Sequence, residues 1–191
     1  MLAILITLCV SANPIEGGWE TIPVNSEQVK TVKPYLDRNL PHLFPEITEG
    51  HYKIASAKLQ IVNGMNLKLI IKKKLTPLKF EISLYVDHEN KITLNDITHF
   101  LGTRPTIGGF NWEDPTSIKQ EDLDNLIVTI QKKVNLLVKT PGKVIVYRKQ
   151  VVNGLKKHVI FRDANQNIFS VLTIRKPNDK TDDLISVYQI Y

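Results

Sequence analysis

The amino-acid sequence predicts an α+β protein in which one small domain, a helix packed across a twisted antiparallel sheet of four to five strands, occurs twice in tandem. Three observations lead to this prediction. The 191-residue chain carries the phrase Gln-(Ile/Val)-Val-Asn-Gly twice, starting at Gln60 and at Gln150. A Gly-Gly pair and an aromatic residue precede each phrase, with 42 positions between Gly18 and Gln60 and 41 between Gly109 and Gln150. Each copy shows a helical pattern followed by strand patterns, which indicates a duplicated unit of about 90 residues.

The helical pattern is clearest in the second copy. Residues 120–139 place apolar side chains three and four positions apart, at Leu123, Leu126, Ile127, Ile130, Val134 and Leu137. Acidic residues open this stretch and lysines gather toward its end, which suits the helix dipole. In the first copy we expect Ser26 to cap a helix whose buried face holds Val29, Val32, Leu36, Leu40 and Leu43. Pro34 interrupts that pattern and predicts a bent or shortened helix.

Strand patterns fill the rest of each copy. In the first copy, residues 78–86 and 91–100 read as strands joined by a turn at 87–90. In the second copy, strands at 167–176 and 184–191 are separated by a polar loop. Each Asn-Gly pair predicts a type I′ hairpin turn, which needs a positive φ at both positions. Residues 102–116 are the expected linker, so we place one domain at 13–103 and the other at 104–191.

The N-terminus has the pattern of a secretory signal peptide over residues 1–12. An apolar run from Leu2 to Val10 precedes the small residues Ser11 and Ala12. We therefore expect a secreted, extracellular protein, with a buried first strand as the alternative. Cys9 is the one cysteine in the sequence and would be removed with this segment, so we expect neither disulfides nor thiol chemistry in the mature chain.

Charge and composition argue against several classes of function. The formal net charge of +6 is mildly basic and far from that of a nucleic-acid-binding protein. The five histidines show no metal-ligand spacing, and no nucleophile or acid–base set stands out, so we expect no cofactor, no metal and no enzymatic activity. Lysines at 72–74 and 156–157 suggest a polyanion patch, but lysines on exposed strand edges also prevent aggregation, and we favour that second interpretation.

A Gly-Gly pair, a helix and then Gln-x-Val-x-Gly resemble the pattern of the cystatins, which inhibit papain-like cysteine proteases. The resemblance covers both copies, and the lack of cysteine in the mature chain is similar to the stefin branch. It implies a reversible inhibitor whose N-terminal trunk, the segment with the glycine pair, joins two hairpin loops in a wedge that fills the protease cleft. It further implies a monomer that binds cathepsin-type proteases, two per chain if both copies act, without nucleic acid or membrane insertion. The implied protease-binding residues are Gly17, Gly18, Gln60, Ile61, Val62, Asn63, Gly64, Ile107, Gly108, Gly109, Gln150, Val151, Val152, Asn153 and Gly154.

The two copies depart from the family pattern in different ways. In cystatins the residue before the trunk glycine enters a largely apolar subsite. Ile107 suits such a subsite, whereas Glu16 would lose its hydration there, so we rank the second copy as the better inhibitor. Neither copy has the Pro-Trp pair of secreted cystatins in its second hairpin, and a polar tip buries less apolar surface. The alternative function is a non-inhibitory binding module on the same scaffold: a carrier, a polyanion- or membrane-binding defence protein, or an inhibitor of another protease class.

Overall fold

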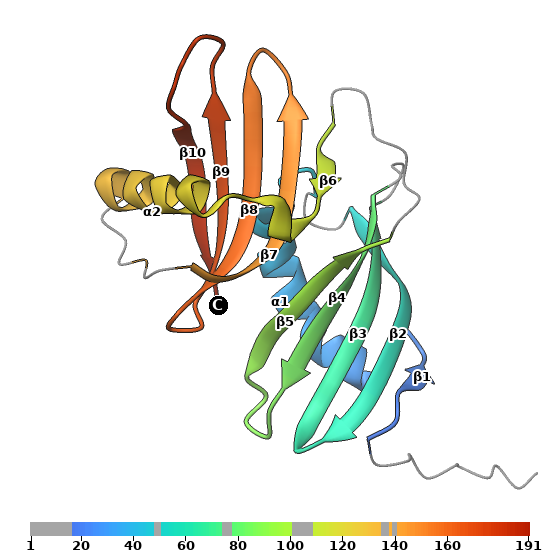
Figure 1. Cartoon of the computed structure of the whole chain (residues 1–191). Coiled ribbons are helices and arrows are strands. Elements are labelled where there is room, and N and C mark those ends of the chain that lie inside the picture. The colour runs from blue at the N-terminus through green and yellow to red at the C-terminus, as the bar shows by residue number, and fades with distance from the viewer. Residues whose placement is uncertain (1–16, 48–50, 74–77, 101–108, 135–137, 139–140) are drawn as a thin grey trace, which may run out of the picture.

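The computed structural model describes residues 17–47, 51–73, 78–100, 109–134, 138 and 141–191. These residues form two five-stranded antiparallel sheets, each with one α-helix, which confirms the predicted α+β class (Figure 1). None of the described helices has both the length and the apolar character needed to cross a bilayer. The expected signal peptide with Cys9, the trunk residues Glu16, Ile107 and Gly108, and Lys74 lie outside the described residues.

The order of elements is the same in both halves of the chain. Repeat 1 (residues 17–100) contains β1 (Glu20–Ile22), α1 (Glu27–Leu43), β2 (Tyr52–Val62), β3 (Gly64–Lys73), β4 (Lys79–Val86) and β5 (Ile92–His99). Repeat 2 (residues 109–191) contains β6 (Asn111–Glu113), the short 3-10 turn Pro115–Ser117, α2 (Gln120–Val134), β7 (Pro141–Val151), β8 (Leu155–Asp163), β9 (Ile168–Arg175) and β10 (Asp183–Ile190). The strands of each sheet pair in chain order, β1 to β5 and β6 to β10, so each sheet is a short edge strand followed by a four-stranded meander.

Helix α1 is continuous despite its two prolines. It runs from Glu27 to Leu43 with Pro34 and Pro41 inside, so it is not shortened, and the bend stays a prediction. Every apolar residue predicted for its inner face is buried, and this packing compensates for the hydrogen bonds that the prolines remove. Ser26 does occupy the N-cap position, but its hydroxyl makes no capping hydrogen bond.

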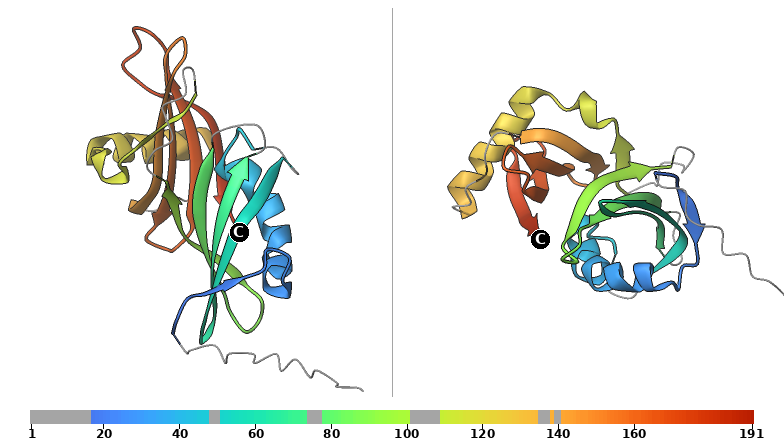
Figure 2. Two further views of the ribbon diagram at one scale, coloured as in Figure 1. Left: turned by 90° about the vertical axis from the view of Figure 1, so that its right-hand side faces the viewer. Right: turned by 90° about the horizontal axis from the view of Figure 1, so that it is seen from below.

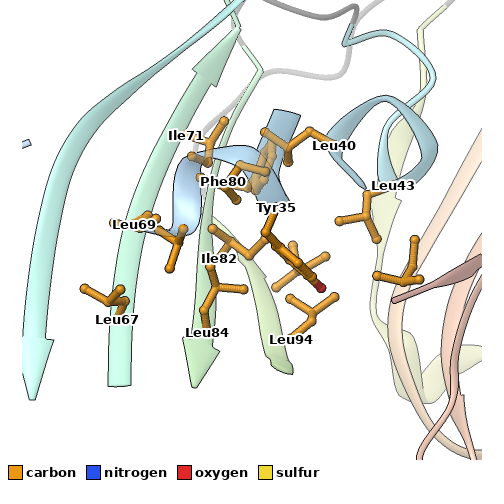
Figure 3. Packing of buried hydrophobic residues seen from close by; sticks show 14 of the residues in the cluster. Tyr35, Leu40, Leu43, Leu67, Leu69, Ile71, Phe80, Ile82, Leu84 and Leu94 are labelled. Atoms are coloured by element: carbon orange, nitrogen blue, oxygen red, sulfur yellow. The ribbon is translucent and has the colours of Figure 1, made fainter. Parts of the chain in front are cut away.

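The core of repeat 1 lies between α1 and the inner face of its sheet. Tyr35, Leu40 and Leu43 of the helix point toward alternate residues of the strands (Figure 3). The strand contribution comes mainly from Leu67, Leu69, Ile71, Phe80, Ile82 and Leu84, all fully buried. Side chains alternate between the two faces of a strand, so the residues between them point to the outer face.

Helix α2 covers one face of the second sheet. Leu123, Leu126, Ile127 and Ile130 are buried as predicted, against a cluster that includes Tyr147, Val159 and Phe169. Val134 is exposed, which corrects the predicted apolar face, and Leu137 lies outside the described residues. The described part of α2 therefore packs against the sheet through its first three turns.

The opposite face of the second sheet packs against repeat 1. Val146, Ile160, Ile168 and Ile190 belong to the same buried cluster as the α1 core. Because both faces are covered, β8 is buried at five consecutive positions, from Lys157 to Phe161. The three views place the C-terminal end of α1 beside this sheet, so the two repeats form one packed unit (Figure 2).

A buried arginine lies at the centre of this contact between repeats. Arg148 on β7 has no exposed surface, and its guanidinium forms a bidentate ion pair with Glu46 of repeat 1. Its Cζ atom lies 4.8 Å from the ring centre of Phe44, 4.7 Å from that of Phe110 and 5.5 Å from that of Trp112. The aromatic rings exclude water from the pair, and cation–π attraction contributes to its stability.

His158 continues the polar network away from Arg148. Its Nδ1 accepts hydrogen bonds from Nε and Nη2 of Arg148 at 3.1 and 2.7 Å, so this nitrogen carries no proton. Its Nε2 lies 2.9 Å from Ser170 Oγ, which in turn donates to the main-chain oxygen of His42 at 2.7 Å. Burial and the neighbouring Arg148 charge hold the pKa of His158 well below its ordinary value.

The network predicts a protein that loses stability in weak acid. The unfolded chain takes up a proton on His158 near pH 6.5, whereas the folded chain resists it, so the free energy of unfolding falls as the pH drops below about 6.5. Burial also lowers the pKa values of His42 and His99, and these act in the same direction. We expect His158→Gln to reduce the loss by on the order of 1 kcal/mol per pH unit between pH 6.5 and 5, measured by urea unfolding at each pH.

The matched control is His88→Gln, because His88 is exposed and lies far from Arg148 along the first sheet. This variant should retain the acid sensitivity of the unaltered protein. An unchanged pH profile in His158→Gln would contradict the assignment of the proton-sensitive group.

Candidate functional site

Three segments of repeat 1 meet at one end of its sheet. They are the Gly17–Gly18 trunk, the β2–β3 turn at Asn63 and the β4–β5 turn at 87–91, and together we call them the first rim. In Figure 1 they lie at the lower end of the molecule, where the β2–β3 and β4–β5 hairpins and the N-terminal segment come together. The glycine pair and the Asn-Gly turn, 42 positions apart in sequence at Gly18 and Gln60, are neighbours in the fold.

Gln60 ties the trunk to the first hairpin. Strand β1 pairs with β2 in a register that sets Glu20 opposite Leu59, so the chain before Glu20 runs along the end of β2. The Gln60 side chain donates from Nε2 to the main-chain oxygen of Gly17 at 2.8 Å. Its Oε1 accepts a hydrogen bond from Asn66 Nδ2, on the facing strand, at 2.9 Å. One side chain therefore connects the trunk to both strands of the β2–β3 hairpin.

Gly64 is required at the first turn by its neighbours as well as by its backbone. Its φ is +110°, and a Cβ atom there would lie 2.6 Å from the main-chain oxygen of Val86 and 2.8 Å from Tyr85 Oη. The close approach lets the second hairpin support the first, because the Tyr85 hydroxyl donates to the main-chain oxygen of Asn63. His88 Nε2 also lies 2.7 Å from Asn63 Oδ1.

The two Asn-Gly turns differ in conformation. In the first, Gly64 alone has a positive φ, so the predicted type I′ turn is wrong there. In the second, Asn153 (φ 43°) and Gly154 (φ 130°) are both positive, as that turn type requires. The first turn departs from the expectation because Asn63 is held by Tyr85 and His88.

Repeat 2 forms a second rim in the same way. Asn111 of β6 pairs with Lys149 of β7, which sets Gly109 beside the end of β7 near Gln150. A Cβ atom at Gly154 would lie 2.6 Å from the main-chain oxygen of Arg175, so the β7–β8 turn packs against the start of the β9–β10 loop. The second rim thus contains Gly109, the turn at 152–154 and the loop at 176–182.

A buried lysine anchors the loop of the second rim. Lys157 Nζ lies 3.0 Å from Asp182 Oδ2 and 3.1 Å from Asp122 Oδ1 of α2. Burial alone would lower the pKa of Lys157, but the hydrogen bonds to Asp182 and Asp122 outweigh it and raise the pKa. Arg175 binds the same Asp182 at 2.8 Å. The sequence pattern gave no sign of this anchor, because Lys157 follows Lys156 in what reads as a solvent-facing pair.

Apolar side chains are exposed on both rims. On the first, Trp19 is 40% exposed, Ile61 38% and Val62 40%, and on the second Val151 is 78% exposed. Exposed apolar residues gathered at loop tips are typical of surfaces that bind a partner. The two aromatic residues that follow the glycine pairs differ, because Trp19 faces solvent while Phe110 packs on Arg148.

The two rims point away from each other. In Figure 1 the β7–β8 and β9–β10 loops lie at the upper end and the first rim at the lower end, and the side view in Figure 2 agrees. The contact centred on Arg148 lies between them. A partner on one rim therefore leaves the other accessible.

The structure places most of the predicted binding residues together. Gly17, Gly18 and the stretch Gln60–Gly64 form the first rim, and Gly109 with Gln150–Gly154 belong to the second. Ile107 and Gly108 lie outside the described residues. Sequence reasoning missed three residues that support the first rim, Asn66 on β3, Tyr85 on β4 and His88 in the β4–β5 turn.

Comparison with known proteins adds no family assignment. No protein-family model matches the chain, and no curated protein matches its sequence. Within the described residues, no group of three or more His, Cys, Asp or Glu side chains is placed to hold a metal ion. The functional argument therefore rests on the geometry of the two rims.

Because Gln60 holds the trunk on the first hairpin, we expect a single substitution at Gln60 to loosen the trunk. Gln60→Leu removes the hydrogen bonds to Gly17 and Asn66 without opening a large space, and we expect a stability loss of about 1 kcal/mol. Amide hydrogen exchange of residues 17–22 should become at least tenfold faster while exchange in α1 is unchanged.

Gln28→Leu is the control, since Gln28 is a half-exposed residue on α1 whose side chain makes no hydrogen bond to the described trunk residues. It should leave exchange at residues 17–22 unaltered. Equal protection of the trunk in Gln60→Leu and in the unaltered protein would show that Gln60 does not hold it.

Proposed function

We propose that the protein is a secreted, non-enzymatic, reversible inhibitor of papain-like cysteine proteases, built from two cystatin-like domains at residues 13–103 and 104–191. The observation that carries this proposal is the assembly of the first rim. The trunk, the Asn-Gly turn and the next hairpin converge on one edge of a five-stranded sheet. The Gln60–Gly17 hydrogen bond joins the trunk to the first hairpin, and the contacts of Tyr85 and His88 with Asn63 join the two hairpins. A narrow edge of that kind has the shape needed to fill a protease cleft.

The rim has the physical properties of a wedge that binds by occupying space. Its turn is fixed by Gly64, Tyr85 and His88 before any partner arrives, so little conformational entropy is lost on docking. Ile61 and Val62 offer apolar surface, and each square ångström that they bury contributes about 25 cal/mol. In this mechanism the wedge blocks substrate access and places no scissile bond at the protease nucleophile.

Two observations favour the first rim as the tighter binder. It exposes three large apolar side chains, Trp19, Ile61 and Val62, whereas Val151 is the large apolar residue most exposed on the second rim. Its aromatic residue is also free of the contact between repeats, while Phe110 packs on Arg148. The opposite ranking, drawn from Ile107 in the second trunk, stays a prediction. Because the rims point in opposite directions, one monomer has room for two proteases.

A second candidate function is a non-inhibitory binding module on the same scaffold. The observation that favours it is a set of lysines on the outer face of the first sheet, including Lys58, Lys68 and Lys72. An anionic partner on that face would not need either rim. The two functions are separable because they use different surfaces.

The direct test is a titration of papain activity with the mature protein and its tip variants. Glycine variants are unsuitable, because any Cβ at Gly64 or Gly154 meets main-chain oxygen. Val62→Asp instead puts a charge on an exposed apolar tip without disturbing a core. We expect Val62→Asp to weaken inhibition by the first rim 10- to 100-fold, about 1.4–2.8 kcal/mol, and Val151→Asp to act likewise on the second.

Val128→Asp is the matched control, since Val128 is 44% exposed on α2, a helix that belongs to neither rim (Figure 1). It should inhibit as well as the unaltered protein. Full inhibition by the Val62→Asp/Val151→Asp double variant would remove the rims from the mechanism, and no inhibition by the unaltered protein would end the proposal.

A further inference from the structure

Among the described residues, five lysines lie on the outer face of the first sheet. The inner face packs on α1, and strand alternation places Lys58, Lys68, Lys72 and Lys79 on the opposite side from their buried neighbours Ala57, Leu67, Ile71 and Phe80. Lys53 pairs directly with Lys72 across the β2–β3 ladder and completes the set. We call these residues, Lys53, Lys58, Lys68, Lys72 and Lys79, the lysine face.

The strand register arranges the lysine face in two rows. Lys53, Lys72 and Lys79 are direct partners on three adjacent strands, and Lys58 is the direct partner of Lys68. Neighbouring strands lie ~4.8 Å apart and four residues along a strand span ~13 Å, which sets the spacing within and between the rows. Like charges directly opposite each other in a sheet are destabilising, so the arrangement opposes folding.

Few acids neutralise these lysines. Lys68 Nζ lies 3.9 Å from Glu81, and this is the one ion pair that a residue of the lysine face makes within the described part of the chain. Across the described residues, no carboxylate lies within ion-pair distance of Lys53, Lys58, Lys72 or Lys79. Aromatic rings position two of the ammonium groups instead, Trp19 at 4.6 Å from Lys68 Nζ and Phe100 at 4.5 Å from Lys79 Nζ.

Protection of an exposed strand edge does not explain the lysine face. The edges of this sheet are β1 and β5, whereas Lys68 and Lys72 lie on β3 and Lys79 on β4, both interior strands. The expectation that the lysines at 72–74 guard an edge is therefore wrong for Lys72. Lysines on interior strands project from the face of the sheet, so their charge attracts anionic partners to that face.

We propose that the lysine face binds a sulfated polysaccharide. Lysine ammonium groups act as point charges that bind sulfates in many orientations, and none of the described arginines belongs to the face. The two rows present positive charge at intervals of roughly 5 Å and 13 Å, which suits a linear chain with repeated sulfates. This proposal does not depend on protease inhibition, because the Lys53–Lys72–Lys79 row lies at the end of the sheet away from Gly64.

Other anionic partners fit the face less well. Single-stranded nucleic acid binds through bases stacked on open aromatic rings, but the rings of Trp19 and Phe100 each have a lysine ammonium over them. Membrane-binding surfaces set exposed apolar side chains beside the basic residues. Ile70, the apolar residue between the two rows, is half-buried and offers a poor anchor. A sulfated glycan needs neither feature.

The test measures the binding of heparin to the full mature chain by titration calorimetry over a range of NaCl concentrations. The Lys53→Gln/Lys72→Gln/Lys79→Gln variant should bind at least tenfold more weakly near 0.1 M salt. The slope of log Kd against log salt should fall by about two to three. The control, Lys119→Gln/Lys132→Gln/Lys180→Gln, removes three charges from exposed lysines of repeat 2 and should change binding less than twofold.

Each outcome decides the proposal. Equal weakening in both triple variants would mean that net charge alone attracts heparin. Unchanged binding in the Lys53→Gln/Lys72→Gln/Lys79→Gln variant would mean that heparin does not bind the lysine face. Either result overturns the proposal. Tighter binding to a single-stranded oligonucleotide or to vesicles of anionic phospholipid than to heparin would overturn the choice of partner. Papain inhibition measured on the same variants should be unaltered, so loss of glycan binding and loss of inhibition are distinguishable.

Discussion

The burial of Arg148 is the constraint on which the arrangement of the molecule depends. A guanidinium without solvent is tolerated only while its partners stay in place, and those partners come from both repeats: Glu46 and Phe44 from the first, Phe110 and His158 from the second. Breaking the contact would leave an uncompensated buried charge, which typically costs 3–5 kcal/mol. The interaction therefore fixes how the second sheet sits on α1. That orientation in turn directs the two rims to opposite ends (Figure 2).

Three residues of the repeated phrase have a structural role in the first rim, and its glycine has one in both rims. Gly64 and Gly154 stand where main-chain oxygens of a neighbouring strand leave no room for a Cβ. Gln60 joins the trunk to the hairpin, and Asn63 receives two contacts from the β4–β5 hairpin. Ile61, Val62 and Val151 have no such structural role, because their side chains face solvent and their apolar character adds little to the stability of the fold. Those are the positions at which a binding role explains more than a structural one.

The sequence predicted those features that depend on residues close together along the chain. The inner face of α1 and the first three turns of α2 follow from apolar spacing, and the strands follow from alternation and turn residues. The contact between repeats was not predictable in this way. Arg148, Lys157 and His158 read as surface residues, yet the second sheet is covered on both faces and their partners are up to 102 positions distant. The turn at Asn63 and the exposure of Val134 were missed for the same reason, since tertiary neighbours determine both.

The proposed inhibition requires that the rims, and not the faces of the sheets, occupy a protease cleft. Hydrogen exchange of the mature protein, free and with papain whose active-site cysteine has been alkylated, tests it most directly. A wedge that makes no bond to the nucleophile should still bind the blocked enzyme. We expect added protection at residues 17–20, 60–64 and 87–91, with matching protection at 150–154 if the second rim also binds. Protection confined to the lysine face or to α2, with the loop tips unchanged, would contradict it.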